Sequence, residues 1–182
     1  MDDIILKLKI WLSQDSVDSI FENNADWHCQ YRNIFQFRQD QFRKAVNDPL
    51  LAAVVGEIGN NSVDHNFARW KDVVGVFFIY DLEKRIVIIA DRGQGVKATL
   101  IKVKPDIKDD EEAVKVAFTQ ILSGRAPEQR GNGLKFSASV VQSKNWNLFL
   151  QSGKGCVVIE NGKIAFESVK SVVNGCLTVI RY

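Results

Sequence analysis

Residues 56–66, Gly56-Glu57-Ile58-Gly59-Asn60-Asn61-Ser62-Val63-Asp64-His65-Asn66, combine apolar residues at helical spacing with a line of polar groups. Successive residues of a helix turn by about 100°, which places Glu57, Asn61 and Asp64 one above another along an edge of the apolar stripe. The stripe consists of Leu51, Val54, Val55, Ile58 and Ser62. We therefore expect a helix that holds two carboxylates and an amide at the margin of a core. The alternative is an amphipathic helix whose polar residues are only solvated.

Gly59 and Asn60 are expected to point away from that core. A glycine inside a helix costs about 1 kcal/mol relative to alanine, so a requirement other than helix stability is indicated here. The helix should begin at Asn47-Asp48-Pro49, which places an N-cap acceptor before a proline in the first turn. We expect it to continue to about Ala68.

The composition is that of an ordinary globular protein. The 182 residues suffice for one domain, residues 1–182, and 46% are hydrophobic and 25% charged. The net charge of +2 gives no indication of binding to nucleic acid or to an anionic membrane. No apolar run approaches the ~20 residues of a membrane span, and the acidic start Met1-Asp2-Asp3 is unlike a secretory signal. A cytoplasmic protein is expected.

The three cysteines are odd in number and widely spaced: Cys29, Cys156 and Cys176. They form no Cys-x-x-Cys pair, so neither a disulfide framework nor a zinc site is predicted. Only His28 and His65 are present, which weakens any metal-cluster hypothesis further. We expect buried free thiols.

Residues 1–46 form an N-terminal extension, for which dimerisation and docking of a protein partner are both open. Residues 4–12 fit a short strand or an amphipathic helix equally. Residues 27–46 are expected to form an amphipathic helix. We assign its aromatic side chains to the core rather than to a nucleic-acid stacking surface, because no basic excess accompanies them.

Two β-rich runs, Val73–Tyr80 and Arg85–Ala90, follow the central helix and should form an antiparallel hairpin. The second run is apolar at nearly every position, so both of its faces should be covered. It leads directly into Asp91-Arg92-Gly93-Gln94-Gly95-Val96. Two glycines just past a strand end suit a chain that turns and lets a ligand approach its backbone.

Residues 92–130 have the character of a lid, because they are polar and enclose one helix expected to start at Asp109 and to stop at Ser123-Gly124. Five cations in or beside it are candidates for neutralising phosphate: Lys97, Lys102, Lys104, Arg125 and Arg130. Lys97 and Arg130 are the best of these because they adjoin glycine motifs.

Arg130-Gly131-Asn132-Gly133-Leu134-Lys135 then opens a helix, and the exposed N–H groups of a helix start favour phosphate. Four short strands are expected after it: Trp146–Gln151, Cys156–Glu160, Lys163–Phe166 and Cys176–Arg181. Asn161-Gly162 is a strong two-residue hairpin signal.

The order of these motifs resembles the GHKL superfamily of ATP-binding domains (the histidine kinase-like, or Bergerat, fold of type II topoisomerases, a heat-shock chaperone, histidine kinases and mismatch-repair ATPases). A helix carries Glu-x-x-x-Asn-Ser-x-Asp-His, a strand runs into Asp-x-Gly-x-Gly, a lid follows, and Gly-x-Gly-Leu opens a helix. The resemblance covers about residues 47–160. It implies a two-layer α/β sandwich: a mixed, mostly antiparallel sheet with helices on one face and an ATP lid.

The resemblance also implies roles for the polar side chains. Glu57 matches the residue that orients and deprotonates the attacking water, and Asn61 the ligand of a Mg²⁺ ion that bridges the phosphates. Asp91 matches the acceptor of the adenine amino group. Asp64 stands where the hydrolytic members carry an aspartate, and His65 where anti-sigma-factor kinases carry a histidine.

The implied backbone contacts come from the two glycine motifs. Gly93 and Gly95, with Val96 and Lys97 after them, would lie against the nucleotide. Arg130, Gly131, Gly133 and Leu134 would form the phosphate cradle at the end of the lid. The second motif has fewer glycines than the versions found in kinases.

Several classes of ATP-using protein are not expected. The sequence has no Gly-x-x-x-x-Gly-Lys-Ser/Thr, so it is not a P-loop protein. His28 lacks the acidic residue that follows a phosphoacceptor histidine, which disfavours an autophosphorylating kinase. Up to Tyr182 there is no room for the further domain that supplies a lysine to the γ-phosphate in topoisomerases.

We therefore expect a stand-alone, Mg-dependent ATP-binding protein that hydrolyses ATP slowly and regulates a protein partner, either as a monomer or as a homodimer. Two alternatives stay open: an anti-sigma-factor-like serine protein kinase, and a module that senses ATP without cleaving it.

Overall fold

The computed structural model describes residues 1–14, 26–66, 70–121 and 132–182. Its strands are β1 (His28–Cys29), β2 (Val76–Asp81), β3 (Ile86–Asp91), β4 (Asn147–Glu160) and β5 (Lys163–Arg181). Its helices are α1 (Asp2–Ser13), α2 (Arg32–Val46), α3 (Pro49–His65), α4 (Gly95–Leu100), α5 (Asp110–Thr119) and α6 (Gly133–Ser143). The strands form one sheet in the order β1-β2-β3-β5-β4, and every pair within the described residues is antiparallel. The predicted α/β class is confirmed.

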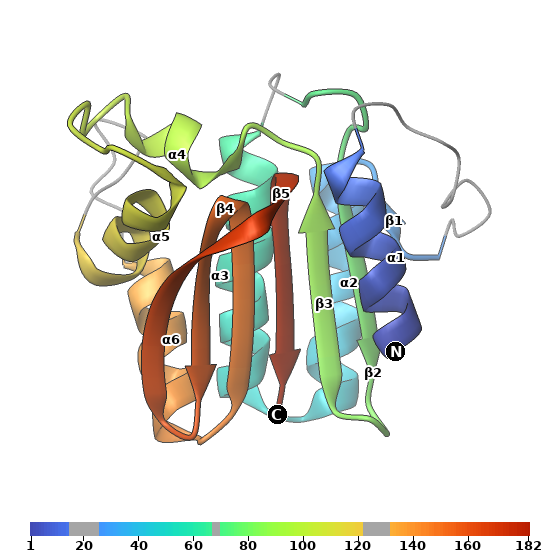
Figure 1. The fold of residues 1–182 in the computed structure, drawn as a ribbon. Coiled ribbons are helices and arrows are strands. Elements are labelled where there is room, and N and C mark those ends of the chain that lie inside the picture. The colour runs from blue at the N-terminus through green and yellow to red at the C-terminus, as the bar shows by residue number, and fades with distance from the viewer. Residues whose placement is uncertain (15–25, 67–69, 122–131) are drawn as a thin grey trace.

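Helices α2, α3 and α6 cover one face of the sheet, and α1 lies on the other (Figure 1). Residues 4–12, for which a strand and a helix were both open, belong to α1. The second face needs cover because all six residues of β3 are buried, as the apolar run predicts. Leu8, Trp11 and Leu12 of α1 supply it by packing against Ile88 and Leu177. None of the described helices has the length and apolar content to cross a bilayer.

Helix α3 begins as the sequence predicts. Asp48 Oδ1 accepts hydrogen bonds from the N–H groups of Leu50 at 3.0 Å and Leu51 at 3.1 Å, and Pro49 occupies the first turn. The helix ends at His65 rather than at about Ala68, which lies outside the described residues. The Asn66 side-chain amide donates a hydrogen bond to the carbonyl of Ser62 at 2.8 Å, which satisfies one of the last acceptors of the helix.

The expectation for Gly59 was wrong. This residue is buried beneath α2, and a Cβ added to it would lie 2.0 Å from the Phe35 ring. A Cβ added to Gly56 would lie 2.2 Å from Gln39 Nε2. The glycines therefore let α2 approach α3 closely. Asn60 is half buried, with a side-chain oxygen that has no partner among the described residues.

Both predicted hairpins are present. β2 pairs with β3 from Val76↔Asp91 to Asp81↔Ile86. Asn161 and Gly162 have φ angles of 52° and 70° and join β4 to β5. The four short strands expected here are two long ones, because irregularities near Gly153 and Gly155 bend the ladder without ending it.

The helix expected in the lid is also present. Asp109 caps α5 by accepting the N–H of Glu112 at 2.8 Å, and the helix ends at Thr119. The stop expected at Ser123-Gly124 lies outside the described residues.

Candidate functional site

The site centres on residues 91–97, which we call the glycine loop. They connect β3, near the middle of the sheet, to α4. Gly95 has a φ of +79°, a conformation that favours glycine. On the β5 side, a Cβ added to Gly175 would lie 2.0 Å from the Asp91 carbonyl oxygen. Bare backbone at these two positions lets the loop lie directly against β5.

Asp91 is fully buried at the start of the glycine loop. Its Oδ1 accepts hydrogen bonds from Asn66 Nδ2 at 3.0 Å and from the Gly93 N–H at 2.9 Å. Its Oδ2 is buried and has no hydrogen-bond partner among the residues that the structure describes. Burial raises the pKa of this carboxyl to about 6, against the opposing effects of Ser62, Gly93 and Asn66. At neutral pH Asp91 is therefore an ionised acceptor, and one of its two buried oxygens has no donor among the described residues.

Asn66 connects α3 to the glycine loop. Its amide nitrogen donates to Asp91 and to the Ser62 carbonyl, and its oxygen accepts the Gln94 N–H at 2.8 Å. Gly93 permits this contact, because a Cβ there would lie 2.0 Å from the Asn66 amide. The sequence interpretation assigned Asn66 no role. A signal was available, because Asn66 continues the four-residue spacing of Ile58 and Ser62 along the buried stripe.

Glu57 and the second glycine motif meet at the start of α6. The Glu57 side chain is exposed on α3, and a Cβ added to Gly133 would lie 2.2 Å from its Oε2. Leu134 packs against the main core. The buried ammonium of Lys135, a residue that the sequence interpretation left without a role, has no hydrogen-bond partner in the described part of the chain. Arg130 and Gly131 lie outside that part.

The remaining predicted residues of α3 lie in different surroundings. Asn61 is half buried one turn after Glu57. Asp64 forms an ion pair with Arg32 at the start of α2. His65 contributes its backbone carbonyl, which accepts the side-chain amide of Gln94 at 2.5 Å.

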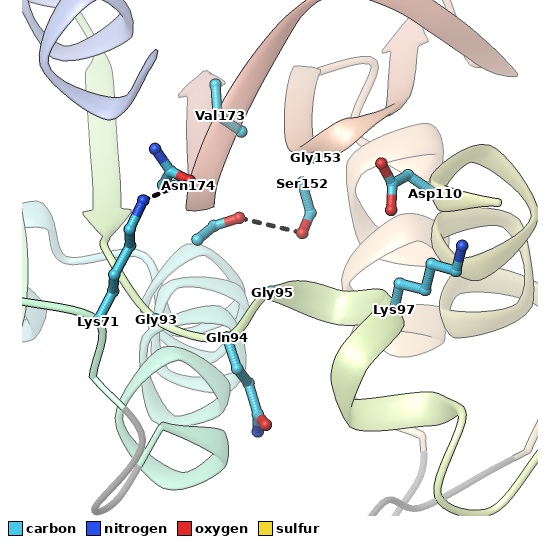
Figure 2. A pocket seen from close by; sticks show the side chains of 11 residues that line it. Lys71, Gly93, Gln94, Gly95, Lys97, Asp110, Ser152, Gly153, Val173 and Asn174 are labelled. Carbon is cyan, nitrogen blue, oxygen red and sulfur yellow. Dashed lines mark hydrogen bonds between the residues drawn. The ribbon is translucent and has the colours of Figure 1, made fainter. Parts of the chain in front are cut away.

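The backbone of the glycine loop lines a cavity of about 360 Å³, facing the irregular part of β4 and β5 (Figure 2). Gly93, Gly95 and Lys97 belong to its lining, whereas the Gln94 side chain points away from it. The other predicted and described site residues are outside the lining: Glu57, Asn61, Asp64, His65, Asp91, Val96, Gly133 and Leu134. The structure thus divides the predicted set between this cavity and the α3 side of the loop.

The described lid cations bond within the protein. Lys97 Nζ donates to the Lys108 carbonyl at 2.9 Å, and Lys102 Nζ donates to Gln94 Oε1 at 3.0 Å. Lys104 pairs with Asp106 at 2.8 Å. Arg125, like Arg130, falls outside the described residues.

Arg92 is a fully buried cation within the loop that sequence reasoning missed. Its guanidinium donates twice to Asp72, at 2.8 and 2.6 Å, and holds the pKa of that carboxyl below its ordinary value. It also donates to the carbonyls of Trp11 at 2.5 Å and Gln14 at 3.0 Å. Arg92 therefore ties the loop to the end of α1.

Comparison with known proteins adds no relative: no protein-family model matches the chain, and a search of curated proteins finds no match.

Proposed function

We propose that the chain is a Mg-dependent ATP-binding protein of the GHKL type, which hydrolyses ATP slowly and uses its nucleotide state to regulate a protein partner. The observation that carries the proposal is the unpartnered Oδ2 of Asp91. A buried carboxylate oxygen without a donor is costly. An exocyclic amino group of a purine is a donor that would satisfy it.

The phosphate end is supported by the first turn of α6. A helix start offers N–H groups and a positive dipole end to an anion. The buried Lys135 ammonium, two residues after Gly133, adds a charge that a phosphate would neutralise. Glu57 is exposed next to Gly133, which suits a base that must reach a water molecule near the terminal phosphate.

A magnesium ion would be held here mainly by phosphate. Among the described residues, no three or more His, Cys, Asp or Glu side chains come together as a metal site. Mg²⁺ bound to phosphates needs only one or two protein ligands and keeps several waters, so the side-chain oxygen of Asn61 is sufficient. The ion would supply charge neutralisation at the phosphates.

Calorimetric titration with ATP, ADP and a non-hydrolysable analogue, with and without Mg²⁺, tests the proposal. We expect Asp91→Ala to lose ATP binding and Glu57→Ala to keep binding but lose hydrolysis. Glu83→Ala is the control, because this exposed carboxylate lies in the β2–β3 turn, at the other end of β3. Saturating ATP without a binding signal contradicts the whole proposal. Intact turnover in Glu57→Ala contradicts the role of that residue.

ATP labelled at the γ-phosphate separates the three modes of action. Release of free labelled phosphate supports hydrolysis. Label transferred to a serine of a partner protein supports the kinase alternative. Tight binding with no turnover over hours identifies a module that senses ATP.

A further inference from the structure

Asn66 is bonded to three parts of the site at once and is only 4% exposed. Both hydrogens of its amide nitrogen are used, one by the Ser62 carbonyl and one by Asp91 Oδ1. Its oxygen accepts the Gln94 N–H. The reversed amide would set oxygen against the carboxylate and nitrogen against an N–H donor, so the network permits one orientation.

Asn66 also determines which oxygen of Asp91 is available. The Asn66 amide and the Gly93 N–H both donate to Oδ1, and Oδ2 is left without a donor in the described part of the chain. Without Asn66 the carboxylate would lose one of its two side-chain contacts, the other being Ser62, and with it part of the restraint on its rotation. Either oxygen could then turn toward a ligand, or toward neither.

Among the described residues, no cation compensates the charge of the Asp91 carboxylate. The groups that act on Asp91 are Ser62 of α3, Asn66 directly after that helix, the Gly93 N–H of the loop, and Cys176 of β5. The guanidinium of the adjacent Arg92 donates instead to Asp72 and to a carbonyl at the end of α1. Hydrogen bonds, and no ion pair within the described residues, therefore keep Asp91 ionised.

We propose that Asn66 is a positioning residue that sets ligand specificity: by bonding to Oδ1 of Asp91 it leaves Oδ2, which is buried and has no donor among the described residues, as the acceptor for a purine that carries an N–H donor at that point. This inference rests on the proposed nucleotide binding. A ligand that lacks the donor leaves a buried carboxylate oxygen unpaired, which costs about 10- to 100-fold in affinity.

Two triphosphates that differ only in the donor measure this selection: ATP, and purine riboside 5′-triphosphate, which lacks the 6-amino group. We expect the wild-type protein to prefer ATP by at least about 10-fold. In Asn66→Ala the affinity for ATP should fall about as much, while the affinity for the purine riboside changes less than about twofold, so the preference disappears. Asn147→Ala, at an exposed position at the start of β4, should leave both affinities unchanged.

A purely structural role for Asn66 gives a different result, because the affinities for both triphosphates fall together, and this overturns the proposal. Tighter ATP binding by Asn66→Ala also overturns it, because Asn66 would then occupy the place of the ligand. In an Asp91→Asn background the further change Asn66→Ala should not reduce the remaining ATP preference. Circular dichroism verifies folding, and the isosteric Asn66→Asp replaces the alanine variant if that one does not fold.

A measurement without nucleotide separates this inference from the proposed function. Carbon-13 NMR titration of the Asp91 carboxyl should show a higher pKa in Asn66→Ala and in Asn66→Asp than in the wild-type protein. The first variant loses a donor to the ionised form, and the second adds a like charge. If the wild-type protein binds neither triphosphate, the proposed function fails, and an unchanged Asp91 pKa then also overturns the positioning role.

Discussion

At the scale of single residues, Asp91 is held by amides rather than by a cation. Arg92, the next residue, donates hydrogen bonds to Asp72 and to two carbonyls at the end of α1. Asp91 accepts hydrogen bonds from the Asn66 amide and from the Gly93 N–H. Two neighbouring charges of opposite sign thus have separate partners. Arg92 therefore does not neutralise the neighbouring Asp91 carboxylate.

The burial of Asp91 predicts a pH dependence of stability. Its pKa is about 6 in the folded protein against an ordinary 3.8, so the folded state binds more protons between these values and stability falls as pH rises through this window. At about 1.4 kcal/mol per pKa unit, the cost above pH 6 is about 3 kcal/mol. The stability of the Asp91→Asn variant should not fall over this pH range, because the asparagine does not titrate. Urea unfolding of both proteins at pH 4 to 7 measures it, and parallel curves contradict the burial of an ionised Asp91.

Residue types at the site were predictable, and their contacts were only partly so. The sequence interpretation selected Glu57, Asp91 and Gly133 by motif, and the structure places Glu57 against Gly133. It could not foresee that Asp64 pairs with Arg32, because that contact depends on how α2 packs on α3. The partner of Asp91 was likewise set by where α3 ends, and helix ends are the least certain part of a sequence pattern.

At the scale of elements, α3 serves two packing surfaces. Its apolar stripe faces the sheet, and its glycines lie under α2. Phe35 of α2 rests over Gly59 and meets Phe78 of β2 edge-to-face, with ring centroids 5.6 Å apart. The glycine that weakens the helix by propensity therefore strengthens its packing. Helical periodicity identifies the face toward the sheet, but it does not reveal a second helix on the opposite side.

Gly59→Ala tests which of these effects is larger. Helix propensity alone would stabilise the variant by about 1 kcal/mol. The added Cβ would lie within 2.0 Å of a ring that is itself fully buried, and overpacking of a core costs about 1–3 kcal/mol. We expect a net loss of unfolding free energy, measured by chemical denaturation.

Two further variants interpret that result. Phe35→Leu in the Gly59→Ala background should recover part of the loss, because the smaller side chain removes the colliding ring. Ala53→Gly, at an exposed position of α3, should cost about 1 kcal/mol through propensity alone. A Gly59→Ala protein more stable than the wild type would show that α2 does not constrain this position.

At the scale of the whole molecule, α1 is joined to the candidate site through Arg92. The guanidinium donates hydrogen bonds to the carbonyls of Trp11 and Gln14 at the end of α1, where a cation also interacts favourably with the helix dipole. The Asn174 side chain of β5 donates to the Gln14 carbonyl at 3.0 Å. The sequence left the purpose of residues 1–46 open. The structure gives α1 a packing role, covering the second face of the sheet and contacting the glycine loop.

Arg92→Met should therefore loosen α1 as well as the loop. The substitution removes the ion-pair partner of Asp72 and the guanidinium donor to two carbonyls, of which the Gln14 carbonyl keeps the Asn174 amide. Because Asp72 is itself exposed, we expect a loss of about 1–3 kcal/mol, the cost of removing one partner from buried hydrogen bonds. Hydrogen exchange should show lost protection in α1 before α3 and α6. ATP affinity should fall with it, because Arg92 lies between Asp91 and Gly93.

Arg181→Ala is the matched control for the same helix. Arg181 pairs with Asp2 at the opposite end of α1, but both side chains are largely exposed, 46% and 89%, so the loss should stay below about 1 kcal/mol. If Arg92→Met and Arg181→Ala have equally small effects and α1 keeps its protection, then α1 is held by its apolar contacts alone. The end of α1 would in that case carry no connection to the glycine loop, and changes at the N-terminus would leave nucleotide affinity unaltered.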